Sequence, residues 1–220
     1  MGYQLNFSSV WQNFDLLLAG LWLGIELSLI SIAIGCALGL TAAFCMLSKN
    51  AGLRWVATLY VTIIRNLPIL ILILMIYFAL PSLGIRLDQL GSFIVTLSLY
   101  AGAYLTEVFR AGLLGIPKGQ REAGQAIGLK EWQIKCYIII PVMFRNVLPS
   151  LSNNFISLFK DTSLAAAIAV PELTFYARKI NLESYRVIET WLVTSLLYIA
   201  TCYLLAALLR MLEQRLALVR

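Results

Sequence analysis

The sequence predicts an all-α integral membrane protein that crosses the bilayer five times. Of its 220 residues, 60% are hydrophobic and 13% are charged, and the mean hydropathy is +0.84, whereas a soluble domain carries roughly 25% charged residues. Its apolar runs are continuous and reach the ~20 residues that a helix needs to cross a bilayer. They lack the strict alternation that marks the ~10-residue strands of a transmembrane β-barrel.

The predicted helices form a single transmembrane domain that covers residues 1–220. The second helix is divided by Arg65 and Pro68 into an interfacial first part and a fully apolar second part. The fourth contains Asn153, Lys160 and Asp161, so we expect it to face protein or water rather than lipid on all sides. In chain order, the helices cover residues 16–47, 55–80, 92–113, 142–170 and 187–209.

Lysine and arginine residues predict the orientation of these helices. Basic residues gather in the cytoplasmic segments that flank membrane spans. In this chain they follow the first, third and fifth helices, and none precedes Lys49. The prediction is an N-terminus outside the cell, a C-terminus in the cytoplasm, and a long cytoplasmic loop over residues 114–141.

Composition argues against several other classes of protein. The net charge of +6 comes from basic residues beside apolar spans, so we expect no nucleic acid partner. The chain has no histidine and its four cysteines form no C-x-x-C pair, which argues against a metal site and against an intramembrane enzyme with a Ser–His or H-E-x-x-H site. No G-x-x-x-x-G-K-[ST] phosphate loop occurs, so we expect neither a catalytic residue nor a cofactor in this chain.

The predicted cytoplasmic loop contains a polar segment, "EAGQAIGLKEWQIKCYIIIP", at residues 122–141. This segment predicts a short helix from Lys118 to Ile127, a break at Gly128, and a second helical run that enters the membrane before Pro141. Small residues on the first helix would let a partner approach its backbone, which indicates a docking element. These small residues are Ala123, Gly124 and Ala126.

The same segment resembles the E-A-A-x3-G-x9-I-x-L-P loop of ABC importer permeases. Two positions depart from that pattern, because Gly124 stands where the family has its second Ala and Ile140 where it has Leu. Neither change alters size or polarity enough to disturb the loop. The residues that match at the right spacing are Glu122, Ala123, Gly128, Ile138 and Pro141.

Three further segments resemble the permeases for polar amino acids. The run "IIRNLPILILILMIYFALP" resembles their R-G-T-P-type segment, "YLTEVFRAGLLGIPKGQREAG" the approach to their loop, and "NNFISLFKDTSLAAAIAVPEL" their K-D-T-S-L segment. Asn66 and Leu67 depart from R-G-T-P, whereas Arg65 and Pro68 carry over. The resemblance therefore extends over most of the chain.

This resemblance implies a type I ABC importer permease core in a bacterial inner membrane, surrounded by lipid. Such permeases pair with an identical or paralogous second permease subunit, and cytoplasmic ABC ATPase subunits that bind ATP and Mg dock under their loops. An extracytoplasmic amino-acid-binding protein delivers the amino acid, and the helices alternate between outward and inward access. The residues implied in coupling to the ATPase are Glu122, Ala123, Gly124, Gly128 and Pro141.

Polar residues at membrane depth are candidates for the translocation pathway or its gate, because they are costly there without a role. Structural alternatives are that Arg65 lies at the cytoplasmic interface and that Glu107 pairs with Arg110 three residues later. The Lys160–Ser163 cluster would then join helices, and Glu122 would complement a helix dipole. The pathway candidates are Arg65, Asn66, Pro68, Glu107, Lys160, Asp161, Thr162 and Ser163.

Two other functions stay open on the sequence alone. One is an ion-coupled secondary carrier or channel subunit that works without ATP, in which the membrane-depth polar cluster is the coupling site. The other is a structural subunit whose paralogous partner forms the path.

Overall fold

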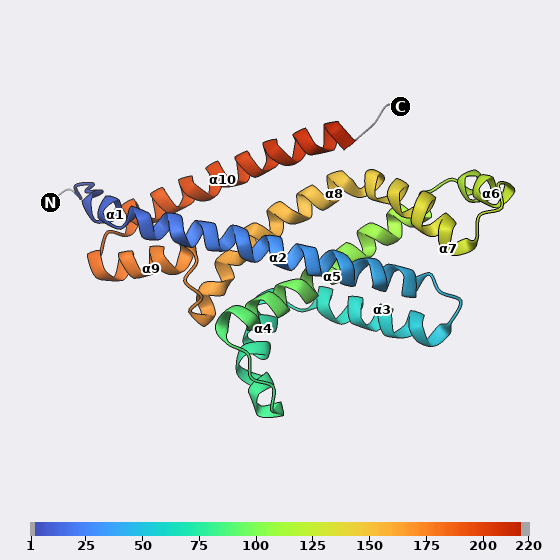
Figure 1. The fold of residues 1–220 in the computed structure, drawn as a ribbon. Coiled ribbons are helices and arrows are strands. Elements are labelled where there is room, and N and C mark those ends of the chain that lie inside the picture. The colour runs from blue at the N-terminus through green and yellow to red at the C-terminus, as the bar shows by residue number, and fades with distance from the viewer. Residues whose placement is uncertain (1–2, 217–220) are drawn as a thin grey trace.

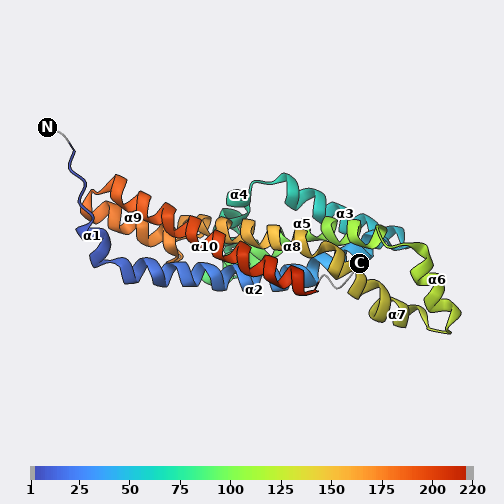
Figure 2. The ribbon, with the colours of Figure 1, turned by 90° about the horizontal axis from the view of Figure 1, so that it is seen from above.

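Every regular element between residues 3 and 216, the residues that this computed structural model describes, is a helix (Figure 1). The molecule is elongated, with α6 and α7 at one end and α1 and α9 at the other, here called the α6–α7 end and the α9 end (Figures 1 and 2). In chain order the elements are α1 (Ser8–Gln12), α2 (Phe14–Met46), α3 (Ala51–Asn66), α4 (Ile69–Leu74), the π-helical turn η1 (Met75–Ala79), the 3₁₀ helix η2 (Leu80–Leu83), α5 (Gln89–Leu114), α6 (Lys118–Ala126), α7 (Glu131–Ile134), the π-helical turn η3 (Lys135–Ile139), α8 (Ile140–Asp161), the 3₁₀ helix η4 (Thr162–Ile168), α9 (Leu173–Ser184) and α10 (Val187–Leu216).

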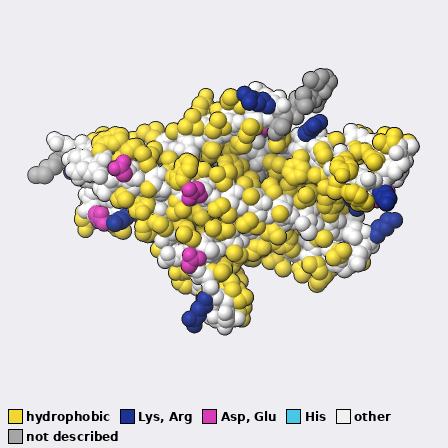
Figure 3. Space-filling view, viewed as in Figure 1, with side chains coloured by type: hydrophobic (Ala, Val, Ile, Leu, Met, Phe, Trp, Pro, Cys, Tyr) yellow, Lys and Arg dark blue, Asp and Glu magenta, His cyan; other side chains and the backbone are white. Residues whose placement is uncertain are grey.

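Four helical stretches within residues 3–216 are long and apolar enough to cross a membrane. A fifth stretch is broken, because its two parts, Ala51–Asn66 and Ile69–Leu83, meet at 107°. Counted as one span, this bent pair completes the predicted five-helix all-α architecture. Hydrophobic side chains cover most of the middle of the molecule, and basic side chains lie mainly toward the α6–α7 end and the end of α10 (Figure 3). The four unbroken stretches are Phe14–Met46, Gln89–Leu114, Glu131–Ile168 and Val187–Arg215.

The bend follows from Pro68. A proline restricts the residue before it to extended backbone and has no N–H to continue a helix. Leu67 accordingly has φ −99° and ψ 137°. The sequence predicted one divided helix over residues 55–80; the structure instead has two helices, the first of which begins at Ala51, and α4 with η1 and η2 projects sideways from the bundle (Figure 1).

The fourth predicted helix, residues 142–170, begins earlier than expected. The helical path starts at Glu131, passes through the π-helical turn η3 without a break, and continues as α8 to Asp161 before tightening into η4. Pro141 follows η3 by two residues, so its missing N–H falls where the π-helical turn already interrupts the α-helical hydrogen-bond pattern. The predicted loop over residues 114–141 is therefore helical over most of its length, and α10 likewise extends past the expected end at residue 209.

One helix, α9, was expected to be loop. Its N-cap is Glu172, whose carboxylate accepts hydrogen bonds from the backbone N–H groups of Thr174 and Phe175, both at 2.8 Å. Leu173, Ala177 and Ile180 recur at helical spacing and are buried. Because these apolar positions are few and lie among charged residues, the sequence did not predict a helix here.

Glycines let α2 and α5 pack closely along the bundle. A Cβ atom on Gly35 would lie 2.7 Å from the Cβ of Ala101, and one on Gly39 would lie 2.9 Å from the Cβ of Leu105. Such small residues let membrane helices approach each other closely. Beside these contacts, the hydroxyl of Tyr60 on α3 donates to the carbonyl of Leu99 at 2.7 Å. These contacts fix the face of α5 that lines the cavity described below.

Candidate functional site

Residues 118–134, here called the α6–α7 element, form a helix, a tight turn and a second helix. The turn depends on Gly128, whose φ of +80° is unfavourable for residues with a side chain. Its N–H donates to the carbonyl of Gln125 at 3.0 Å, and the next N–H, of Leu129, donates to the carbonyl of Gly124 at 3.1 Å. These bonds satisfy the carbonyls at the end of α6 as in a helix C-cap. The sequence-predicted break thus lies at Gly128, between α6 and α7.

Side chains also hold the two helices together. Arg121 on α6 forms an ion pair with Glu131 on α7 at 2.9 Å, and the Gln125 side-chain amide donates to the same carboxylate at 3.1 Å. Gly124 is buried, and a Cβ atom there would lie 2.9 Å from Cδ1 of Ile138. The close neighbour of the Gly124 backbone is therefore the chain's own helix, and not an outside partner as the sequence suggested.

The other residues of the predicted coupling motif face outward. Glu122, Ala123 and Gly128 are exposed. Within residues 3–216, Glu122 has no ion-pair partner. Two large apolar side chains beside them are also exposed, Ile127 at 75% and Trp132 at 56%. Pro141 is exposed too, but it lies on α8 beyond the α6–α7 element.

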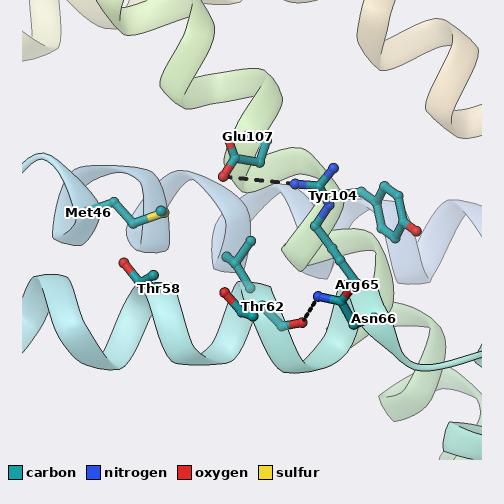
Figure 4. Close-up of a pocket in the computed structure, with 8 residues that line it drawn as sticks. Met46, Thr58, Thr62, Arg65, Asn66, Tyr104 and Glu107 are labelled. Atoms are coloured by element: carbon teal, nitrogen blue, oxygen red, sulfur yellow. Dashed lines mark hydrogen bonds and ion pairs between the residues drawn. The ribbon is translucent and has the colours of Figure 1, made fainter.

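A cavity of about 360 Å³ lies among the ends of α2 and α3 and the side of α5 (Figure 4). It is lined by three of the predicted pathway residues, Arg65, Asn66 and Glu107. Arg65 and Asn66 end α3 directly before the bend, so the break at Pro68 is what presents them to α5. Pro68 itself is the N-cap of α4 and acts through this geometry.

The charged groups of this cavity form a shared network. The Glu107 carboxylate accepts from Nη2 of Arg110 at 2.6 Å and lies 3.9 Å from Nη1 of Arg65. The guanidinium carbon of Arg65 also lies 5.1 Å from the ring centre of Tyr104, at cation–π distance. Glu107 therefore pairs with Arg110, as the structural alternative predicts, and it also lines the cavity with Arg65.

An aromatic pair connects this cavity with the fourth span. The rings of Tyr104 and Tyr100 lie 4.7 Å apart on one face of α5, and Tyr100 packs against the core cluster that contains Leu158 of α8. The sequence did not single out these tyrosines, although Tyr100, Tyr104 and Glu107 recur at helical spacing.

The other members of the polar cluster point elsewhere. Lys160 is exposed. Thr162 is buried, donates to the carbonyl of Phe159 at 2.7 Å, and packs against Gly24 of α2, where a Cβ would lie 3.1 Å from its Oγ1. Ser163 is half-buried in η4. Within residues 3–216, no group of three or more His, Cys, Asp or Glu side chains is arranged to hold a metal ion.

Residues 35–218 match the family described as the inner membrane component of binding-protein-dependent transport systems. The chain belongs to this family. As an inner membrane component with several apolar helices, it is a multi-pass membrane protein.

Individual relatives match over nearly the full chain. The glutamine transport system permease protein GlnP of Escherichia coli (strain K12) is 36% identical, with 96% of this chain and 98% of that protein covered. The L-cystine transport system permease protein TcyB of Bacillus subtilis (strain 168) is 38% identical, with 98% and 93% covered. A solved amino acid ABC transporter with histidines has a chain with a TM-score of 0.87 and 29% identity, and the match covers 97% of this chain and 100% of that chain. These matches confirm the resemblance to ABC importer permeases and their five-helix fold.

Proposed function

We propose that this chain is the permease subunit of an ATP-driven importer for polar amino acids. In this proposal it pairs with an identical or paralogous permease subunit and takes its cargo from an extracytoplasmic binding protein. The names of relatives that carry glutamine and cystine support an amino acid as cargo. The observation that carries the coupling role is the α6–α7 element, which presents Glu122 and Ala123 outward while its internal contacts are already satisfied.

The partner at this element would be a cytoplasmic ABC ATPase, which binds ATP and Mg. Ile127 and Trp132 would supply the apolar centre of the contact, and Glu122 a charge at its rim, in the usual pattern of protein interfaces. Movement of the ATPase would reach the membrane through η3, because α7 and α8 form one continuous helical path to Asp161. This role requires the α6–α7 end to be cytoplasmic and the α9 end to lie outside.

The Arg65 cavity would then form part of the translocation pathway or its gate. A guanidinium binds a carboxylate well, and a carboxylate accepts hydrogen bonds from an ammonium group. Arg65 and Glu107 therefore offer complementary charges to the two ends of an α-amino acid, while the ion pair with Arg110 orients the Glu107 carboxylate. Alternation between open and closed states would change the 3.9 Å separation of Arg65 and Glu107.

The decisive experiment uses the permease with its ATPase, second permease subunit and binding protein in proteoliposomes. Glu122→Lys should lower ATP-driven amino acid uptake at least tenfold and weaken co-purification of the ATPase. The matched control is Glu183→Lys on α9, another exposed glutamate that is 61% accessible and 4.0 Å from Lys179. If Glu122→Lys leaves both uptake and co-purification intact, the coupling role is wrong.

The same vesicles test the alternative functions. Uptake by the permease without its ATPase would identify a secondary carrier or channel and overturn the proposal. For the pathway, Arg65→Ala should reduce uptake while the ATPase still co-purifies, whereas the exposed Arg54→Ala at the start of α3 serves as the control. Equal uptake by Arg65→Ala and the control would remove this cavity from the pathway.

Cys136 provides a test of orientation, because it is exposed in η3 whereas Cys36, Cys45 and Cys202 are half-buried in the spans. A membrane-impermeant maleimide should label Cys136 only after intact spheroplasts are permeabilised. In a Cys136→Ser background, Tyr185→Cys at the α9 end should be labelled without permeabilisation. The reverse pattern would contradict the proposed orientation.

A further inference from the structure

Three side chains from two helices meet at the Arg65 cavity (Figure 4). Arg65 is in the last turn of α3, whereas Tyr104 and Glu107 are three residues apart on α5 and so share one face of that helix. The guanidinium carbon of Arg65 lies 5.1 Å from the ring centre of Tyr104, and its Nη1 lies 3.9 Å from Oε1 of Glu107. Arg65 is therefore placed between the face of a ring and a carboxylate.

The Glu107 carboxylate does not bind Arg65 closely. A guanidinium that hydrogen-bonds a carboxylate lies about 2.7–2.9 Å from it. Arg110 reaches this separation, because its Nε and Nη2 donate to Oε2 of Glu107 at 2.9 and 2.6 Å. Within residues 3–216, no carboxylate lies nearer to the Arg65 guanidinium than the 3.9 Å of Glu107. Arg65 can therefore offer its N–H donors to a further carboxylate.

Tyr104 supplies the contact that holds Arg65 in this position. A cation that lies over a ring within ~6 Å of its centre is attracted by the negative charge of the ring face. The Tyr104 ring is itself fixed by Tyr100, whose ring lies 4.7 Å away and which packs against the core. The face on which the Arg65 guanidinium rests is thus held by α5 and does not depend on α3.

A structural explanation of Tyr104 would be that it only packs α3 against α5. Another tyrosine already makes this connection, since the Tyr60 hydroxyl of α3 donates to the carbonyl of Leu99 on α5 at 2.7 Å. Leu99 lies five residues before Tyr104, or about 7.5 Å along the helix axis. The contact of Tyr104 with Arg65 adds a feature that packing alone does not require, a cation held at the cavity that Glu107 also lines.

We propose that Tyr104 is a positioning residue for transport, which holds the Arg65 guanidinium away from Glu107 and so keeps it available to the carboxylate of the cargo. The inference rests on the proposed function for the identity of the cargo, an α-amino acid. When a cargo carboxylate binds Arg65, the Tyr104 ring continues to support the orientation of the guanidinium. Without the ring, Arg65 would turn to Glu107 and form the close ion pair that excludes the cargo.

The first test replaces Tyr104 and measures the initial rate of ATP-driven uptake by the complete transporter in proteoliposomes. The probes are radiolabelled L-glutamine, L-arginine and L-cystine, each delivered by the binding protein. Phe keeps the ring face, 3,4,5-trifluorophenylalanine keeps the ring but weakens its negative charge, and Leu removes it. We expect uptake in Tyr104→Phe within about twofold of the wild type, and a loss of at least about threefold in the other two variants while the ATPase still co-purifies. Equal uptake by all three variants would overturn the inference.

The matched control is Tyr77 of η1, another half-buried tyrosine. Its ring lies 4.8 Å from that of Phe78, and no cation lies over it within residues 3–216. Variants with Phe and with 3,4,5-trifluorophenylalanine at position 77 should take up the probes at equal rates. If the fluorinated ring lowers uptake by the same factor at positions 77 and 104, Tyr104 acts by packing and the inference is wrong.

A second test asks whether Tyr104 acts through Arg65. Tyr104→Leu should lower uptake in the wild-type background but not in Arg65→Gln, which has already lost the cation. Thermal unfolding of the wild type, the two single variants and the double variant gives a readout that does not depend on the cargo. The fall in midpoint of the double variant should be smaller than the sum of the two single falls. Additive effects in either measurement would contradict the inference.

These outcomes are distinct from a failure of the proposed function. Absence of uptake for all three probes by the wild type counts against the proposed cargo class, and the unfolding measurements then still decide whether Tyr104 holds Arg65. Uptake by the wild type together with additive effects of Tyr104→Leu and Arg65→Gln refutes only the inference about Tyr104.

Discussion

The two ends of the molecule use their acidic residues in opposite ways. At the α9 end, Glu172 and Glu189 are fully buried, and each carboxylate receives hydrogen bonds from the chain itself. At the α6–α7 end, Glu122 and Glu131 are exposed, and the ion pair of Glu131 with Arg121 is more than half accessible on both sides. Buried polar groups whose hydrogen bonds are all made stabilise the fold. Exposed ion pairs contribute little to stability until a partner covers them.

This difference indicates that the α9 end is shaped by its own contacts, whereas the α6–α7 end leaves charged side chains exposed, as the proposed docking role requires. Substitutions at the α9 end should therefore lower the stability of the isolated chain. Substitutions at the α6–α7 end should chiefly affect assembly and transport. Four experiments sharpen or break this contrast, in order of the expected change in stability.

The largest loss is expected for Glu189→Ala. The Glu189 carboxylate accepts hydrogen bonds from the Tyr3 hydroxyl and, at 2.7 Å, from the Asn6 N–H, and it lies 3.6 Å from Nη1 of Arg186. Removal leaves the Tyr3 hydroxyl and the Asn6 N–H without this acceptor and Arg186 without its ion pair. The midpoint of thermal unfolding in detergent should fall further than in any of the variants below.

The control for that variant is Glu183→Ala, because Glu183 is exposed and only 4.0 Å from Lys179. It should change stability by less than about 0.5 kcal/mol. Limited proteolysis should also cut the segment before α1 faster in Glu189→Ala than in the control. Equal midpoints for the two variants would contradict the contrast between the ends.

A smaller effect is expected from the pH dependence of Glu172. Burial raises the pKa of its carboxyl from the ordinary 4.5 to about 7. Hydrogen bonds from Thr174, Phe175 and Tyr198 lower the pKa, but they offset only part of this rise. Because the folded chain binds this proton more tightly, the resulting stability is fully present below pH 4.5 and is lost as the pH rises through about 7. The unfolding midpoint should fall by roughly 5 °C between pH 5 and pH 8.

The variant that checks this origin is Glu172→Gln, which cannot titrate. It should unfold at a lower temperature at pH 5, since its NH₂ group faces backbone donors, and its midpoint should change less between pH 5 and pH 8. If the unfolding midpoint of Glu172→Gln falls between pH 5 and pH 8 as much as that of the wild type, another group causes the pH dependence.

At the α6–α7 end, Gly128→Ala should cost about 1 kcal/mol because of its positive φ. Gly84→Ala is a matched control, since Gly84 has φ +85° and, like Gly128, has no atom within 4 Å of an added Cβ. The two variants should lose similar stability, but only Gly128→Ala should reduce ATPase co-purification. Equal co-purification would show that the turn is not part of the docking surface.

The smallest effect is expected for Gly124→Ala. The added Cβ would meet the flexible ends of Ile138 and Ile134, at 2.9 and 3.0 Å, and a shift of these side chains should limit the loss to under about 1 kcal/mol. Gly35→Ala should cost more, because its Cβ would meet Ala101 at 2.7 Å and the backbone N of Gly102 at 3.2 Å. Denaturant unfolding monitored by tryptophan fluorescence would rank the two; the reverse order would contradict the packing argument.

Much of the fold could be predicted because long apolar runs leave few alternatives in a membrane. The runs that became α2 and α5 were located to within three residues at each end. The bend at Pro68 was harder, since the sequence indicates a division but not an angle. The helical run before Pro141 was predicted, but not its unbroken junction with α8, because a proline normally marks a boundary.

The candidate site was less predictable, because residues close in sequence point in different directions. Lys160 and Asp161 are neighbours, yet on a helix they are about 100° apart, so Lys160 is exposed whereas Asp161 is partly buried. The sequence predicted that Gly124 is open to a partner, whereas in the structure Ile134 of α7 and Ile138 of η3 pack against it. Glu172 and Glu189 lay in or beside a segment expected to be loop, where an acidic residue is ordinarily solvated, and only tertiary packing buries them.

The π-helical turn between α7 and α8 has a consequence for how this chain tolerates changes in length. A π-helical turn holds one more residue than the α-helical turn it replaces. Loss of a single codon within residues 135–139 would therefore convert η3 to ordinary α-helix while the helical path stays unbroken. The same loss within α8 would rotate every later side chain by about 100° and move Thr162 away from Gly24 of α2. Insertions and deletions among related genes should accordingly collect at η3 and be excluded from α8.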